Sequence, residues 1–139
     1  MVLVGELDYF YQKIKRRFGG VKGIVFTDFV SDEELAALYQ NAAVYVFPSL
    51  CEGFGLPPLE AMAYDLPVVC SNSSCLPEIL GEAAEYFNPE SVDDMAGKIG
   101  SVLSDKNLQS RLISSGRERI KKYSWKKMAQ ETLKTYLGW

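Results

Sequence analysis

Residues Val44–Glu60 read VYVFPSLCEGFGLPPLE, and this stretch decides the fold of the chain. The apolar run Val44–Phe47 is typical of a short strand, whereas the glycine-rich segment after it predicts a tight loop. Pro57 and Pro58 favour the first turn of a helix, because the first N–H groups of a helix have no intrahelical partner. The stretch therefore predicts a strand, a loop and a helix in immediate succession.

The same alternation extends on both sides of this stretch. Further apolar strands are predicted at Val2–Val4, Ile24–Phe26, Pro67–Cys70 and Glu85–Phe87. The first of these is expected to be fully buried, and only helical periodicity follows Ser91. Short apolar strands that alternate with helices predict an α/β fold. We expect a Rossmann-like parallel sheet of about five strands with helices on both faces.

Local patterns define the helices in more detail. The first helix presents one apolar face, formed by Leu7, Phe10, Tyr11, Ile14 and Phe18. Ser31 and Glu34 form an S-x-x-E capping box, which predicts the start of the second helix. In the last helix, aromatic residues are expected to pack against the body of the domain; these are Trp125, Tyr136 and Trp139.

A ligand site is expected where the strands of a parallel sheet end, because ligands bind at the carboxyl edge of such sheets. The corresponding loops follow Gly5, Phe26, Phe47 and Cys70. In the loop after Phe47, Gly53 and Gly55 allow positive φ and close approach of the backbone to a ligand. The helix that begins after this loop is expected to bind an anion, for which a diphosphate is the natural candidate.

Two carboxylates flank this expected anion site. Glu52 lies in the loop, and Glu60 lies about one turn inside the helix. An ionised carboxylate only accepts hydrogen bonds, so these residues suit the vicinal hydroxyls of a ribose or a hexose. The competing interpretation is that the loop is an ordinary tight turn and that Glu60 is a solvated helix residue.

Composition limits the functional classes. The chain has 139 residues, of which 47% are hydrophobic, and its formal net charge is −3. This length fits one domain, and the charge gives no reason to expect a nucleic-acid partner. No apolar run approaches the roughly 20 residues that span a bilayer. We therefore expect a soluble, cytoplasmic protein.

The residue types also restrict the chemistry. The chain contains no histidine, so any catalysis must use carboxylates, backbone dipoles or groups of the substrate. Its three cysteines lack both a CxxC pair and a histidine partner, which argues against zinc and disulfides. They are expected to be buried as small apolar residues. A basic segment, Arg117–Lys127, is expected to be a solvated helix surface, with peripheral contact to anionic lipid as the alternative.

The chain resembles the C-terminal, donor-binding domain of GT-B fold glycosyltransferases, in particular the retaining family 4 (group 1) enzymes. Glu52 and Glu60 match the E-x7-E motif of that family. The resemblance also covers GIVFTDFV at 23–30, VFPS at 46–49, EAMA at 60–63, PVV at 67–69 and YSW at 123–125. It extends from about Val2 to Tyr136.

The resemblance implies a role for each site residue. Glu52 is expected to hold the donor sugar close to the reacting carbon, and Glu60 to accept hydrogen bonds from the ribose. The backbone amides of the loop are expected to contact the sugar or diphosphate; the loop residues are Gly53, Phe54, Gly55 and Leu56. Val30 is expected to border the nucleotide base. The family implies same-face transfer in which the leaving diphosphate helps to deprotonate the acceptor. It implies no bound metal or other cofactor.

Two departures from the family pattern are expected to matter. Asp65 stands where the family usually has Gly, and because Asp tolerates left-handed geometry we expect the turn to survive. The family also has an N-terminal acceptor domain, and a first strand of this domain whose loop carries an Arg and a Lys that clamp the diphosphate. We expect both to precede residues 1–139, which then form a single truncated nucleotide-sugar-binding domain that is inactive alone.

Two other classes remain open at this point. A non-catalytic Rossmann-like binding domain would keep the sheet and use the Gly-Phe-Gly loop only as a turn. A GT-B epimerase or phosphorylase would share the fold, but the sequence has no histidine and no cofactor lysine motif to support it.

Overall fold

The computed structural model describes residues 1–138, which form an α/β protein with parallel strands. These residues divide into two compact units, 1–38 and 39–138. All five predicted strands are present, and every strand pair is parallel.

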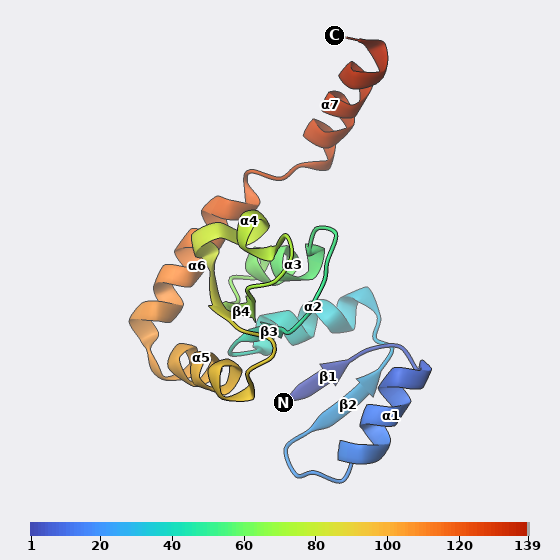
Figure 1. Cartoon of the computed structure of the whole chain (residues 1–139), viewed down its shortest axis with the longest axis vertical. Coiled ribbons are helices and arrows are strands. Elements are labelled where there is room, and N and C mark those ends of the chain that lie inside the picture. Colours follow the sequence, from blue (N-terminus) through green and yellow to red (C-terminus); the bar gives the residue numbers. More distant parts are fainter. Residues whose placement is uncertain (139) are drawn as a thin grey trace. The chain divides into compact units, whose positions relative to one another are not determined.

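The first unit is a β-α-β arrangement followed by most of a second helix. Its elements are β1 (Val2–Val4), α1 (Tyr9–Phe18), β2 (Val25–Asp28) and the start of α2 (Asp32–Asn41) (Figure 1). Strands β1 and β2 pair with Val2 opposite Val25 and Leu3 opposite Phe26.

Side-chain caps fix both helix starts in this unit. The Asp8 side chain accepts the N–H of Tyr11 at 2.7 Å and caps α1. The predicted capping box is confirmed, because the N–H of Ser31 reaches Glu34 at 2.8 Å and the N–H of Glu34 reaches Ser31 at 3.3 Å.

The expected burial of this unit is wrong. Val2 and Val4 of β1 are 47% and 43% exposed. The predicted apolar face of α1 is exposed as well, with Phe10 71% accessible. A two-stranded sheet with one crossover helix has too little surface to cover both of its faces. Periodicity thus predicted the helix and strands of this unit correctly, but it did not predict that their apolar side chains are exposed.

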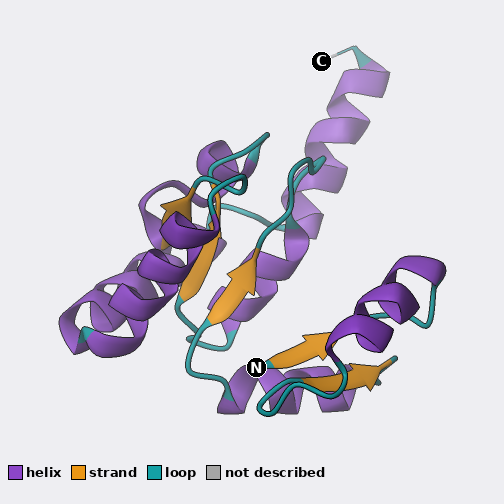
Figure 2. Cartoon of the chain, turned by 60° about the horizontal axis from the view of Figure 1, so that its bottom comes forward, coloured by secondary structure: helices purple, strands orange, loops and turns teal. Residues whose placement is uncertain are grey.

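The second unit contains a three-stranded sheet in the order β3-β4-β5. Its elements are β3 (Tyr45–Phe47), α3 (Leu56–Ala63), β4 (Val68–Ser71), α4 (Leu76–Leu80), the 3-10 turn η1 (Gly81–Ala83), β5 (Ala84–Phe87), α5 (Val92–Ser104), α6 (Lys106–Ile120) and α7 (Trp125–Leu137). Figure 2 shows helices on either side of this sheet. The short helix α4 was not predicted, because five residues give no helical period.

Both faces of the three-stranded sheet are covered. On one face, Val69 and Phe87 pack with Val102 of α5 and Leu112 of α6. Helix α3 contacts β3 and β4 and contributes no residue to that cluster, so it covers the opposite face. All four residues of β4 are buried, as expected for a central strand between two helix layers.

The five strands form two sheets, of two and three strands, whereas one sheet of about five was expected. Sequence alone predicts strands and does not show which edges pair.

Helix α7 has no buried residue. Trp125 is 70% exposed and Tyr136 is 83% exposed, so the expected packing of these side chains is wrong. Trp139 lies outside the described residues. Across residues 1–138, the helices are too short or too polar to cross a bilayer.

Candidate functional site

The candidate site lies in the second unit, where β3 and β4 end. Phe47 is opposite Cys70 in the parallel register, so the loops that leave these strands start side by side. The hydroxyl of Ser71 donates to the carbonyl of Ser49 and joins the two loops at their base. The loop at 48–55 is therefore built against the segment at 72–75.

Gly55 is the glycine that this loop requires. Its φ is +89°, and it forms the N-cap of α3. A Cβ placed there would lie 2.7 Å from Cδ2 of Leu76, which is fully buried. Gly53 differs, because it has no positive φ and no heavy atom within 4 Å of an added Cβ. The expected positive φ is thus confirmed at Gly55 and wrong at Gly53.

The start of α3 offers fewer hydrogen-bond donors than expected. The helix begins at Leu56, so Pro57 and Pro58 are its second and third residues and carry no N–H. No side chain caps this terminus. An anion at this position would meet the amides of the loop and of Leu56, and not a full set of helical N–H groups.

Glu52 and Glu60 both lie within electrostatic reach of one half-buried tyrosine, Tyr45. The pKa of Tyr45 is raised by burial, then by Tyr39, and then by the negative charges of Glu60 and Glu52. Glu52 is half-buried and Glu60 is exposed. The structure therefore brings the two predicted carboxylates into one region, although seven residues and a helix start separate them.

A buried tyrosine, Tyr39, lies next to Glu60. Tyr39 is only 7% exposed, and its ring centroid lies 5.6 Å from those of Tyr45 and Tyr64. Its hydroxyl lies close to Tyr45 and Glu60, and its pKa is raised by burial and then by the charge of Glu60. No sequence pattern predicted this contact, because the hydroxyl of a core tyrosine has no characteristic spacing.

Three of the predicted residues line a groove of about 800 Å³ between α3 and the last turn of α6 with α7. They are Phe54, Leu56 and Glu60. The Phe54 ring packs edge-on against Tyr123, with centroids 5.3 Å apart and planes at 84°. The side chain of Phe54 thus belongs to the wall of the groove, which leaves its backbone amide as the group for a ligand.

Val30 belongs to the first unit. It is half-buried and lies between β2 and α2, next to the capping box. The other predicted site residues belong to the second unit.

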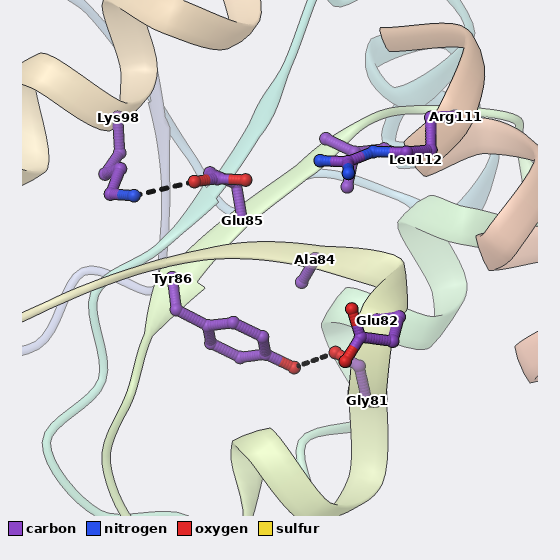
Figure 3. A pocket seen from close by; sticks show the side chains of 8 residues that line it. All are labelled: Gly81, Glu82, Ala84, Glu85, Tyr86, Lys98, Arg111 and Leu112. Carbon is purple, nitrogen blue, oxygen red and sulfur yellow. Dashed lines mark hydrogen bonds and ion pairs between the residues drawn. The ribbon is translucent and has the colours of Figure 1, made fainter. Parts of the chain in front are cut away.

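A second cavity, of about 260 Å³, lies at the start of β5 (Figure 3). Its wall contains the Lys98–Glu85 ion pair, 2.7 Å long, and the Tyr86 hydroxyl, which donates to the carbonyl of Gly81. Ligands of parallel sheets bind at the carboxyl ends of the strands, and this cavity lies at the amino end. The loop after β3 remains the better candidate.

Asp65 keeps the turn after α3, as expected. Its φ is +57°, the left-handed conformation that a glycine would adopt. Arg117 of α6 donates two hydrogen bonds of 2.7 Å to its carboxylate. The hydrogen bonds and charge of Arg117 hold the pKa of Asp65 below its usual value.

The cysteines only partly fit the expected burial. Cys70 is buried in β4, and burial raises the pKa of its thiol to about 12. Cys51 is exposed, because it lies in the candidate loop rather than in a strand. Cys75 is half-buried and its thiol donates to the carbonyl of Glu52 at 3.3 Å. The segment after Cys70 was predicted as a site loop, but its individual residues were not.

Comparison with known proteins decides the family. The model of glycosyl transferases group 1 matches residues 1–119. This chain belongs to the group 1 glycosyltransferases. It is 37% identical over 133 residues to the O-antigen chain mannosyltransferase B of Escherichia coli, which covers 94% of the chain and 34% of that protein. It is 41% identical over 122 residues to the MMP alpha-(1->4)-mannosyltransferase of Mycolicibacterium hassiacum, covering 84% of the chain and 30% of the relative.

A solved structure confirms the fold of this group 1 domain. Sucrose-phosphate synthase of Thermosynechococcus elongatus superposes with a TM-score of 0.83 at 27% identity, over 99% of this chain and 37% of that one. The group 1 chain therefore spans about a third of the length of the relatives that it matches. The resemblance to the C-terminal domain of a GT-B enzyme is confirmed.

Proposed function

We propose that this chain forms the donor-binding part of a hexosyltransferase, which binds a nucleotide-diphosphate sugar and transfers its sugar with retention. One observation carries the proposal. In a chain matched by the group 1 family over residues 1–119, Glu52 and Glu60 flank the Gly55 turn where the strands end, and both act on Tyr45. A purely structural turn needs no pair of carboxylates at this edge, so a non-catalytic binding domain is not favoured.

The proposed roles follow from the position of each group. Glu60 accepts hydrogen bonds from the ribose, and Glu52 holds hydroxyls of the sugar near the reacting carbon. The amides of Phe54, Gly55 and Leu56 bind the sugar or the diphosphate, which fits a helix start whose next two residues are prolines. Val30 borders the base in this proposal. Transfer proceeds without a bound metal, so EDTA is expected to leave donor affinity unchanged.

Mannose is the first sugar to test, because both relatives described above are named as mannosyltransferases. The acceptor and the Arg/Lys clamp on the diphosphate belong, in this proposal, to segments that precede the domain. The donor-binding part is expected to transfer no sugar alone, because donor and acceptor must be held together.

The proposed location is the cytoplasm, with peripheral contact at the inner face of the membrane. Support comes from exposed basic residues at the C-cap of α6 and in α7, among them Lys121, Lys126 and Lys127. An electrostatic contact weakens with salt because ions screen surface charge. Binding to anionic vesicles that did not decline with added salt would contradict this part of the proposal.

The donor site is tested by titrating the ¹⁵N-labelled chain with UDP-, GDP- and ADP-sugars. We expect chemical-shift changes in the loop at 53–60 with one base preferred. Glu60→Gln should weaken binding roughly tenfold to a hundredfold, because it removes a charged hydrogen-bond acceptor. Glu82→Gln is the matched control, since Glu82 is an exposed carboxylate at the amino end of β5. Equal losses in both variants, or no shifts at millimolar donor, would contradict the proposal.

A further inference from the structure

The main chain of Glu52 is held by the segment that follows β4. The Ser74 hydroxyl donates to the carbonyl of Glu52 at 2.8 Å and accepts the N–H of Glu52 at 3.4 Å. The Cys75 thiol donates to the same carbonyl at 3.3 Å. Both polar groups of the Glu52 peptide backbone are thus engaged by side chains that lie 22 and 23 residues further along the chain.

The backbone of Ser74 is strained. Its φ is +57°, in the left-handed region that costs a residue with a Cβ about 1–2 kcal/mol. Asp65 and Asp28 also have positive φ, but aspartate tolerates this region better than serine does. A glycine would meet the geometry at Ser74 without strain. The hydroxyl is the only group that serine adds to offset this cost, and it is the group that contacts Glu52.

In the part of the chain that the structure describes, the hydrogen bonds of Glu52 run through its main chain, and its carboxylate takes part in no hydrogen bond or ion pair, which leaves it available to a ligand. The loop around it has no regular structure, and Gly53 beside it has open space around its Cα. The direction in which Glu52 presents its side chain therefore depends on how its main chain is held.

We propose that Ser74, assisted by Cys75, is a positioning residue that sets the orientation of Glu52 toward the donor sugar. This inference rests on the proposed function of Glu52. Glu60 stands on α3 and is held separately by Tyr39, so loss of the Ser74 hydroxyl should affect the sugar and leave the nucleotide unaffected. Ser74 thus contributes to the distinction between a nucleotide sugar and the bare nucleoside diphosphate.

The test measures affinity for the nucleotide sugar and for its nucleoside diphosphate by titration calorimetry, using the base and sugar selected by the NMR titration. Ser74→Ala removes the hydroxyl and keeps the strain, whereas Ser74→Gly removes both. We expect each variant to lower the sugar-to-diphosphate affinity ratio about tenfold, because one or two modest hydrogen bonds are lost. Hydrogen exchange at the amide of Glu52 should become faster in both variants of the ligand-free chain.

Ser73→Ala is the matched control, because Ser73 is the neighbouring serine and has normal backbone geometry. An unchanged ratio in Ser74→Ala would overturn the inference, and so would a loss in Ser74→Ala that Ser74→Gly restores, since strain would then be the cause. Equal losses of affinity for nucleotide sugar and diphosphate would also overturn it, because they indicate a general structural role.

A Glu52→Gln variant separates this inference from the proposed function. If Glu52→Gln lowers the ratio and the Ser74 variants do not, the proposed function stands and the role of Ser74 fails. If Glu52→Gln and Glu60→Gln both bind donor like the original chain while Ser74→Ala speeds hydrogen exchange at Glu52, the proposed donor site is wrong. The contact of Ser74 with Glu52 is then only structural.

Discussion

The two units use the same order of strand, helix and strand, and they bury their side chains to very different extents. No residue of Met1–Leu38 is buried, whereas every residue of β4 in the second unit is. Both units have amphipathic helices and parallel strands. The difference lies in what covers the sheet. The second unit has helices on both faces and a central strand, and the first unit has two strands that are both edges.

This comparison shows that a segment can form regular helices and strands without forming a buried apolar core. In the first unit, hydrogen bonds within the β-α-β arrangement fix the geometry, such as the Tyr11 hydroxyl that accepts the N–H of Asp28 at 2.8 Å. In the second unit, apolar residues from two strands and two helices meet in one cluster. Burial of apolar surface is the dominant favourable term in folding, so the second unit should carry most of the stability of the chain.

The largest expected effect follows from removing one aromatic ring in each unit. Phe87→Ala should destabilise the second unit by about 3–5 kcal/mol, because it empties a site that is 1% exposed. Phe26→Ala should cost the first unit at most about 2 kcal/mol, since Phe26 is only half-buried. Native-state hydrogen exchange, read separately for the amides of each unit, measures both values. Similar losses in the two units would refute the proposed difference in core.

A matched pair of glycines gives the next largest effect. Gly55 and Gly23 both have φ of +89°, but only Gly55 has a neighbour within 4 Å of an added Cβ, at Leu76. Gly23→Ala should therefore cost only the left-handed backbone penalty of about 1–2 kcal/mol. Gly55→Ala adds overpacking against a buried leucine, for a total of about 2–5 kcal/mol. Urea denaturation measures the free energy of unfolding of both variants. An equal loss at both positions would show that Leu76 moves aside freely.

The smallest expected effect concerns acid. Arg117 lowers the pKa of Asp65, so folding favours the ionised carboxylate. This contribution to stability is present above the pKa of the unfolded chain, and it disappears as pH falls through the lower pKa of the folded chain. Carboxyl-carbon NMR should show a titration midpoint for Asp65 below the ordinary value of about 3.9.

Arg117→Gln should return that midpoint toward the ordinary value. Glu33 in the first unit is the internal control, because its lowered pKa comes from hydrogen bonds to its own backbone and to Ser31 and not from Arg117. If the titration midpoint of Asp65 did not change in Arg117→Gln, the ion pair between Arg117 and Asp65 would not be maintained in solution.

Much of the site could be predicted from sequence because its signals are local. The turn at Gly55 and the prolines after it depend on neighbouring residues only, and so does the spacing of Glu52 and Glu60. The same interpretation overestimated the anion site. It expected the free N–H groups of a helix start, but the second and third residues of α3 are Pro57 and Pro58, which carry no N–H.

The remaining parts depend on contacts between distant segments. Ser74 lies 22 residues from Glu52 along the chain, and its role became visible only when the register of β3 and β4 placed their loops together. Tyr39 shows the same limit, because its hydroxyl reaches Glu60 from a different helix.

The sequence by itself determined the five strands, most of the helices, the capping box, the left-handed turn at Asp65 and the pair of carboxylates. These features arise from interactions among residues a few positions apart, which periodicity and turn chemistry express directly. Only the tertiary structure decided which strands pair, which apolar faces are buried and which side chains hold Glu52 and Glu60. Those outcomes depend on packing and hydrogen bonds between remote segments, and no local pattern encodes them.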